Sequence, residues 1–263
     1  MSEPVLYAVD HGIATITLNR PDAMNSLDIP TKNALRDATQ AAATDDAVRC
    51  VVLTGSGRAF CVGQDLKEHI GLLESGAEDQ LFSTVAEHYN PTVTALATMP
   101  KPVIAAVNGV AAGAGASLAL ACDFRVLADT AGFNFAFAGV ALSCDTGVSW
   151  TLPRIVGRAA ALDLLFFPRT VDAKESADLG LATSVVPPDQ LEGTVAELAT
   201  RLAAGPTVAY GSIKRAVNNS SATELTEALV FEGEMMTLTG STEDHRNAVA
   251  SFVAKERPVF QGR

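Results

Sequence analysis

The sequence has little positive charge, and this shortage excludes whole classes of partner. Its 263 residues carry 19 lysines and arginines against 30 aspartates and glutamates, a formal net charge of −11. Nucleic acids and anionic membrane surfaces both bind through a basic face, so neither is expected as a main partner. Charged residues are also scarce, at 19% against 48% hydrophobic residues, which argues against a disordered chain.

Cysteine pairs and targeting signals are missing as well. The chain has four cysteines, Cys50, Cys61, Cys122 and Cys144. They form no CxxC pair and no cluster with histidine. This pattern predicts reduced thiols, a cytoplasmic location and no metal site. No basic stretch followed by an apolar one opens the chain, so no signal peptide is expected. The most apolar segment, residues 103–121, is rich in alanine and glycine, which contribute little to membrane insertion. A membrane-spanning helix is therefore not expected there.

Strands and helices alternate through most of the chain. Strands are predicted at residues 7–9, 13–18, 49–54, 103–107 and 124–127. Asp28 is expected to cap a helix over residues 28–43. Further helices are predicted at residues 78–98, 113–121, 159–166, 173–179, 189–204, 207–217, 224–239 and 243–255. This alternation is typical of an α/β protein with a largely parallel sheet, and the last quarter is expected to be helical.

Two segments, residues 48–68 and 101–123, share one design: a buried strand, a glycine-rich turn and the start of a helix. Glycine lets backbone approach a ligand closely, and the first N–H groups of a helix lack partners. One N–H from each turn, converging on one oxygen, would form an oxyanion hole. The alternative is close packing of helix against strand around small residues. Neither segment holds a Gly-Lys-Ser/Thr phosphate loop or a GxGxxG dinucleotide motif.

Five segments, in order along the chain, resemble the enoyl-CoA hydratase/isomerase, or crotonase, family. They are NRPDAMNSL (19–27), AFCVGQDLKE (59–68), the second glycine-rich segment with FNFAFAGVALSCDTGVSWTLPRIVG (133–157), ADLGLATSVVP (177–187) and ERPVFQGR (256–263). The resemblance implies a crotonase-like spiral of ββα units over residues 1–200. It implies a helical region over residues 201–263 that makes subunit contacts and encloses coenzyme A. It also implies an acyl-CoA thioester substrate, no separate cofactor and a homotrimer or hexamer.

The resemblance also assigns roles to single residues. The backbone N–H groups of Gln64 and Ala114 align with those that hold the thioester oxygen, and losing one such donor costs about 3 kcal/mol of transition-state stabilisation. The two glutamates of the hydratases align with Ser117 and Phe137, which do no acid–base work at neutral pH. The alternative role of Ser117 is packing within a helix. Phe137 is expected to line the acyl pocket. The other substrate-binding positions are Met24 and Leu66 at the coenzyme A channel, Leu142 with Phe133 and Phe135 at the acyl pocket, and Phe260 at the adenine end.

Asp145 stands where the hydratases commonly have glycine, and this resembles the bacterial 1,2-epoxyphenylacetyl-CoA isomerases. One carboxylate can take the α-proton of a 3-enoyl thioester and return it to the γ-carbon. The main prediction is therefore an enoyl-CoA double-bond isomerase of fatty-acid or phenylacetate-type breakdown, with Asp145 as proton shuttle. The alternatives are a hydratase lacking the usual glutamate pair, a dehalogenase or hydrolase with Asp145 as nucleophile, and a non-catalytic acyl-CoA binder.

A structural role for Asp145 also remains open. Aspartate is a favoured N-cap, and Asp145 would then cap a helix that begins near Thr146. A helix start lowers the pKa of an aspartate, whereas an apolar pocket raises it. The sequence alone leaves the direction of this pKa shift undecided.

Overall fold

Two sheets form the core of the computed structural model, which describes residues 3–263 and, for residues 78–80, the backbone alone. The larger sheet has the order β1-β2-β3-β5-β7-β10. Its strands are β1 (Val5–Asp10), β2 (Ile13–Leu18), β3 (Cys50–Gly55), β5 (Val103–Val107), β7 (Phe124–Ala128) and β10 (Ser184–Val186). In this sheet β1 pairs antiparallel with β2, and the other pairs are parallel. All five residues of β5 are buried, as expected for a parallel strand covered on both faces.

The smaller sheet has the order β4-β6-β8-β9. Its strands are β4 (Ala59–Cys61), β6 (Val110–Ala112), β8 (Gly132–Asn134) and β9 (Thr170–Asp172). The strands β3, β5 and β7 of the larger sheet are each followed by a strand of the smaller one. The chain thus advances as a spiral of paired strands with helices between them, which confirms the predicted fold. The sequence patterns miss the short strands because three residues carry too little periodicity to be recognised.

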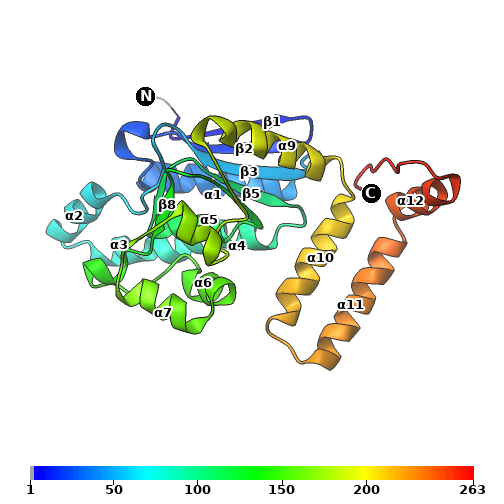
Figure 1. Cartoon of the computed structure of the whole chain (residues 1–263). Coiled ribbons are helices and arrows are strands. Elements are labelled where there is room, and N and C mark those ends of the chain that lie inside the picture. Colours follow the sequence, from blue (N-terminus) through cyan, green and yellow to red (C-terminus); the bar gives the residue numbers. More distant parts are fainter. Residues whose placement is uncertain (1–2) are drawn as a thin grey trace.

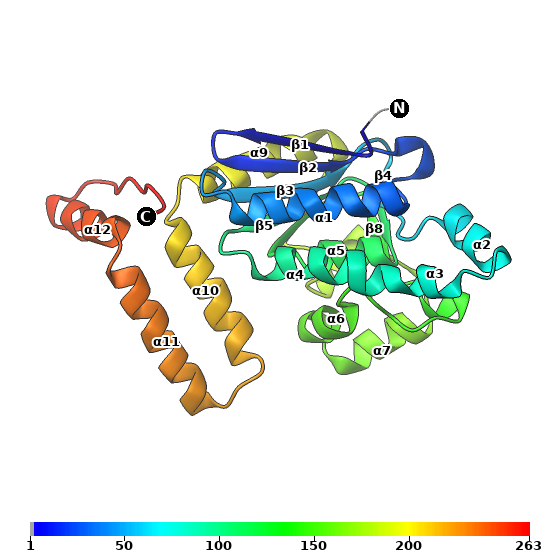
Figure 2. The ribbon, with the colours of Figure 1, turned by 180° about the vertical axis from the view of Figure 1, so that it is seen from behind.

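Helices cover the larger sheet on opposite faces (Figures 1 and 2). On one side α1 (Ile29–Thr44) packs against β1 and β2, and on the other α9 (Leu191–Ala203) packs against β3, β5 and β7. The carboxylate of Asp28 accepts a hydrogen bond from the N–H of Thr31 at 3.0 Å, which confirms the predicted cap of α1. The remaining helices of the body are α2 (Leu66–Glu74), α5 (Ala114–Leu120), α6 (Val148–Val156), α7 (Arg158–Phe166) and α8 (Ala173–Asp178).

The helix predicted over residues 78–98 contains a local change of winding. It consists of α3 (Glu78–Thr84), the π-helical segment η2 (Val85–Tyr89) and α4 (Asn90–Thr98). Pro91 has no N–H, so it cannot donate to the carbonyl of Glu87 four residues earlier. The guanidinium of Arg36 donates to that carbonyl instead, at 3.4 Å. A π-helical turn of this kind is frequent at functional sites.

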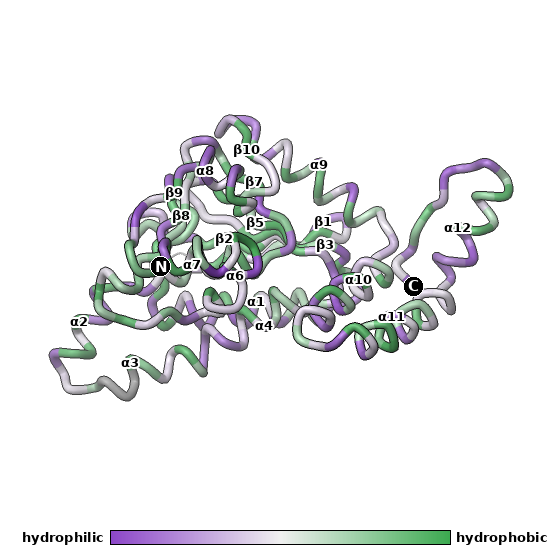
Figure 3. Tube along the Cα trace, turned by 60° about the horizontal axis from the view of Figure 1, so that its bottom comes forward, coloured by the Kyte–Doolittle hydropathy of each residue, from purple (hydrophilic) through white to green (hydrophobic). Residues whose placement is uncertain are grey.

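Three helices form an arm that projects from the body (Figure 1): α10 (Thr207–Ser220), α11 (Leu225–Gly240) and α12 (Glu243–Ala254). Apolar stretches run along α11 in Figure 3. The exposed apolar side chains of the arm include Leu225, Leu229, Val230, Met236, Phe252 and Val253. The predicted boundary between the spiral core and the C-terminal helical region, at residues 200 and 201, falls within helix α9, which ends at Ala203. This boundary stays a prediction. In the part of the chain that is described, every helix is too short or too polar to cross a membrane.

Candidate active site

The two glycine-rich turns meet in direct contact. A Cβ added to Gly63, whose φ is +82°, would lie 2.9 Å from the carbonyl oxygen of Ala112 and 3.2 Å from the nitrogen of Ala114. A Cβ added to Gly115 would lie 2.1 Å from the carbonyl oxygen of Cys61. Glycine is therefore required at both positions for the turns to approach this closely. The contact places Gly63, the residue before Gln64, directly against the backbone nitrogen of Ala114.

Both peptide N–H groups at this contact lack a partner. The N–H of Leu27 donates to the carbonyl of Gly63 at 2.8 Å, and the N–H of Asp65 donates to the carbonyl of Leu27 at 3.2 Å. Gln64, which lies opposite Leu27 in this β-bridge, therefore directs its own N–H to the other side. Ala114 is the first residue of α5, where an N–H has no acceptor within the helix. Neither amide donates to any residue that the structure describes.

The segment NRPDAMNSL braces the first turn. The carboxylate of Asp65 caps α2 by accepting from the N–H groups of Lys67 and Glu68, and it also accepts from Ser26 at 2.8 Å and Arg20 at 3.0 Å. Burial acts to raise the pKa of Asp65, but these hydrogen bonds outweigh it and lower the pKa. Asp65 therefore stays ionised and fixes the turn that carries Gln64.

Asp145 lies half-buried on the loop between the short helix η3 (Ala138–Val140) and α6. Burial is the largest influence and raises its pKa, against a hydrogen bond from the Thr146 hydroxyl at 2.8 Å and the positive charge of Lys32. Helix α6 begins at Val148, and no side chain caps it. The helix-cap interpretation of Asp145 is therefore wrong, and the raised pKa is the direction expected for an apolar pocket. Thr146 adopts φ +51°, a strained conformation for a β-branched residue.

A partly buried hydrogen-bonded network joins the Gln64 turn to Tyr89, Glu68 and Lys32. The hydroxyl of Tyr89 donates to Gln64 Oε1 at 2.6 Å, and Gln64 Nε2 donates to Glu68 Oε1 at 3.3 Å. Lys32 Nζ, whose side chain is 1% exposed, lies 3.0 Å from the same Glu68 oxygen. Burial raises the pKa of Tyr89 well above its ordinary value, and the charge of Asp145 is the next cause. Tyr89 is therefore hydrogen-bonded to Gln64 and feels the charge of Asp145.

Sequence motifs do not reveal this network, although the sequence contains one signal of it. Lys32 falls on the buried face of α1 with Leu35, Thr39 and Ala42, at helical spacing. A lysine on a buried face needs a partner, and Glu68 is that partner. For Tyr89 the sequence offers no comparable signal, because the π-helical turn sets its direction.

An apolar pocket of about 460 Å³ adjoins the Asp145 loop. Its lining residues are Phe137, Ala138, Leu142, Ser143, Cys144, Ser149, Pro153, Arg158, Ala161, Leu162, Leu165 and Phe166. Phe137 and Leu142 are thus brought together as lining residues. Phe133 and Phe135, expected to line this pocket, are instead fully buried and stacked on each other at 6.4 Å. They flank half-buried Asn134 at the end of β8, and the sequence does not indicate on which side these aromatic rings are buried.

The other predicted substrate-binding residues differ in their burial and in their distance along the fold from the glycine turns. Ser117 is fully buried, and its hydroxyl donates to the carbonyl of Gly113 at 3.1 Å, as a helix-packing residue would. Leu66 is 60% exposed at the start of α2, directly after the Gln64 turn, and Met24 is half-buried in the bracing segment. Phe260 lies elsewhere: its carbonyl accepts from Arg49, which precedes β3, whereas the two glycine-rich turns come after the other ends of β3 and its parallel neighbour β5. Within one chain Phe260 is not part of this site.

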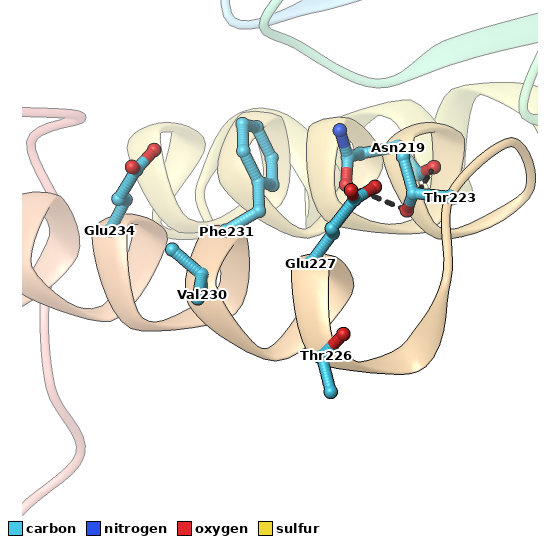
Figure 4. A pocket seen from close by; sticks show the side chains of 7 residues that line it. All are labelled: Asn219, Thr223, Thr226, Glu227, Val230, Phe231 and Glu234. Carbon is cyan, nitrogen blue, oxygen red and sulfur yellow. Dashed lines mark hydrogen bonds between the residues drawn. The ribbon is translucent and has the colours of Figure 1, made fainter.

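A second hollow of about 460 Å³ lies in the arm between α10 and α11 (Figure 4). Its lining residues are Asn219, Thr223, Thr226, Glu227, Val230, Phe231 and Glu234. Two glutamates among seven residues make it unsuited to a ligand that carries phosphates. The pocket beside Asp145 is therefore the better candidate for an anionic thioester.

The described residues offer no metal cluster, and the thiol of Cys61 beside the glycine turns is not activated. Within residues 3–263, leaving aside the side chains of 78–80, no group of three His, Cys, Asp or Glu residues could hold a metal ion. Burial is the main cause that raises the pKa of Cys61 to about 12, so this thiol beside the glycine turns stays protonated.

Comparisons with known proteins agree with this geometry. The family model described as enoyl-CoA hydratase/isomerase matches residues 8–263. A 1,2-epoxyphenylacetyl-CoA isomerase from Escherichia coli is 40% identical over 263 residues, with 100% of both chains covered. A probable enoyl-CoA hydratase from Rhodobacter capsulatus is 39% identical, with 98% of both chains covered. The crystal structure of a putative enoyl-CoA hydratase/isomerase from Mycobacterium abscessus is 39% identical, with a TM-score of 0.94 over 98% of this chain and 100% of the other.

Proposed function

This chain belongs to the enoyl-CoA hydratase/isomerase family, and we propose that it moves the double bond of an enoyl-CoA thioester. One observation supports the proposal: the charge of the half-buried carboxylate Asp145 acts on Tyr89, and Tyr89 is hydrogen-bonded to Gln64, which carries one of the two peptide N–H groups without an acceptor among the described residues. The N–H groups of Gln64 and Ala114 bind the thioester oxygen. Asp145 moves the proton between the carbons that follow the carbonyl.

The reaction needs one base and one oxyanion hole. The carboxylate of Asp145 takes a proton from the α-carbon of a 3-enoyl thioester, and the electron pair of that C–H bond delocalises onto the thioester oxygen. The two N–H groups stabilise the resulting enolate. The carboxylic acid then gives the proton to the γ-carbon, and the double bond ends between the α- and β-carbons. The raised pKa of Asp145 makes its carboxylate a stronger base than an exposed aspartate.

Ser117 and Phe137 favour isomerisation over hydration. They stand at the positions of the two hydratase glutamates in the resemblance, and neither side chain exchanges protons at neutral pH. Isomerisation requires no water to be activated, so one carboxylate is sufficient. The names of the relatives include both isomerase and hydratase, so the residues of this site are the stronger argument.

The apolar pocket next to Cys144 favours a hydrophobic acyl group. Aliphatic and aromatic side chains dominate its lining, and its polar side chains are mainly at Ser143, Ser149 and Arg158. Burial of an apolar chain or ring there would stabilise the bound thioester in proportion to the area removed from water.

The proposed reaction can be tested with 3-hexenoyl-CoA as substrate. The absorbance of the conjugated 2-enoyl thioester is followed as it forms. Asp145→Asn keeps the size of the side chain and removes the base, so kcat is expected to fall by about 10²–10⁴-fold. Unchanged turnover in this variant would remove Asp145 from the mechanism. Rapid loss of conjugated absorbance from crotonyl-CoA would instead favour the hydratase alternative. A covalent adduct on Asp145 in single-turnover mass spectrometry would favour the nucleophile alternative.

The exposed apolar side chains of the arm support a further part of the proposal, a homotrimer or hexamer, and the four unpaired cysteines fit the cytoplasmic location that we propose with it. Phe252 and Val253 are 84% and 77% exposed on α12 in the single chain. Such a face is typical of a surface covered in an assembly. The mass of the purified protein by light scattering is expected to be three or six times that of one chain, and a monomer at micromolar concentration would contradict this.

A further inference from the structure

We propose that Tyr89 is a positioning residue that acts through the side chain of Gln64 to hold the Gln64 N–H toward the thioester oxygen. The inference rests on the proposed use of this N–H as an oxyanion donor. It adds a residue to the site that neither the sequence motifs nor the two glycine turns supply.

The side chain of Gln64 is held at both of its polar atoms. Its oxygen accepts from the Tyr89 hydroxyl at 2.6 Å, and its nitrogen donates to Glu68 Oε1 at 3.3 Å. The 2.6 Å bond is the shorter of the two, so Tyr89 gives the stronger restraint. The peptide before Gln64 is tied to Leu27, but only by the bond to the carbonyl of Gly63. The side-chain bonds therefore complete the fixation of this residue.

The position of Tyr89 is itself fixed. The residue is 4% exposed at the end of the π-helical segment η2, directly before Asn90 and Pro91. Its ring faces the ammonium of Lys32, whose Nζ lies 5.8 Å from the ring centroid and is bonded to Glu68. A rigid aromatic ring, held by a buried ion pair, presents its hydroxyl to Gln64 with little freedom to move.

Removal of the hydroxyl has a consequence that can be followed. In Tyr89→Phe the ring stays, but the half-buried Gln64 Oε1 loses its donor, which is unfavourable. The oxygen then turns toward other donors, and the unpaired N–H groups of Gln64 and Ala114 are available. A Gln64 oxygen that competes for these groups weakens the oxyanion hole without removing any group that touches the substrate.

Tyr89 does not act as a proton donor in this proposal. Burial and the nearby charges of Asp145 and Glu68 favour the neutral phenol, so it titrates outside the working range. The group keeps its hydrogen bond to Gln64 at every pH used for catalysis. The pH dependence of kcat in Tyr89→Phe is therefore expected to match that of the wild type.

The first test is a double-mutant cycle on isomerisation of 3-hexenoyl-CoA. Tyr89→Phe is expected to lower kcat about tenfold and to change KM less than twofold. Gln64→Met keeps the backbone N–H and removes both side-chain polar atoms. Adding Tyr89→Phe to Gln64→Met is expected to have no further effect. The matched control is Tyr210→Phe on α10, which is expected to leave kcat unchanged. A tenfold loss from Tyr89→Phe in the Gln64→Met background, or no loss in the wild-type background, would overturn the proposal.

The second test separates this inference from the reaction. An unreactive saturated thioester, hexanoyl-CoA, is bound to the protein, and its carbonyl stretch is measured by difference infrared spectroscopy. Wild type and Tyr210→Phe are expected to shift the stretch to lower frequency, and Tyr89→Phe to shift it less. A full shift in Tyr89→Phe would refute the role of Tyr89 and leave the proposed function standing. No shift in the wild type, with no turnover of 3-hexenoyl-CoA, would refute the proposed function itself.

Discussion

The contact between the two glycine turns provides a sharp test of the site, through the variant Gly115→Ala. The added Cβ would lie 2.1 Å from the carbonyl oxygen of Cys61, whereas ordinary contacts begin at 3.4 Å. One of the two backbones must therefore move by about 1.3 Å, the difference between these distances. The three nearest atoms are the carbonyl oxygen, carbonyl carbon and Cβ of Cys61, which all move with the main chain, so no flexible side chain can absorb the shift.

The displacement separates the N–H of Ala114 from that of Gln64. A misplacement of about 1 Å at a reacting centre costs about 10²-fold in rate, and loss of one oxyanion donor costs about 10²–10³-fold. We expect kcat on 3-hexenoyl-CoA to fall at least about 100-fold. Overpacking is expected to lower the free energy of unfolding by about 1–3 kcal/mol, which thermal unfolding measures.

Gly193→Ala is the matched control. Gly193 also lies in the first turn of a helix, α9, but an added Cβ there meets nothing within 4 Å. Alanine favours a helix over glycine by roughly 0.5–1 kcal/mol, so this variant is expected to be slightly more stable and fully active. A Gly115→Ala protein with kcat within threefold of the control would show that the spacing of the two turns does not decide the rate.

Three further variants test the charge of Asp145 and the acyl pocket. Because folding raises the pKa of Asp145, the ionised carboxylate destabilises the folded state above that pKa, and the effect vanishes below the ordinary value of 3.8. Asp145→Asn is therefore expected to raise Tm at pH 7, with a gain that shrinks as the pH falls; an equal or lower Tm at pH 7 would contradict the burial argument. Lys32 lowers the pKa of Asp145, so in Lys32→Met the loss of kcat on acidification is expected at higher pH than in the wild type, and an unmoved pH profile would exclude this charge effect. Ser149→Phe narrows the pocket from an exposed lining position, so kcat/KM for 3-decenoyl-CoA is expected to fall about tenfold more than for 3-hexenoyl-CoA. Equal losses for both chains would show that the acyl group lies elsewhere.

Local chemistry made part of the site predictable. The glycines of the two turns and the helix starts after them are visible in the sequence, because close backbone approach demands glycine and a helix start leaves N–H groups unpaired. Asp145 could be singled out because it departs from the pattern of the resembling family. The direction of its pKa shift could not, since burial and a helix start act in opposite directions and only coordinates show which is present.

Other features depend on contacts between distant segments. Tyr89 reaches Gln64 across 25 positions of sequence, and Lys32 reaches Glu68 across 36. Phe133 and Phe135 were assigned to the pocket from their apolar character, but the sheet turns both into the core. Apolar character gives the tendency to be buried and not the surface against which a residue is buried.

The α/β alternation, the buried strands, the cap at Asp28 and the two glycine turns can be read from the sequence, because these depend on hydrophobic periodicity and on backbone geometry within a few residues. The folded chain was needed to show that burial raises the pKa of Asp145, that α6 begins beyond it without a side-chain cap, and that Phe260 lies at the opposite end of β3. Hydrogen bonds, ion pairs and desolvation act over a few ångströms in space, and distance along the chain does not reveal them.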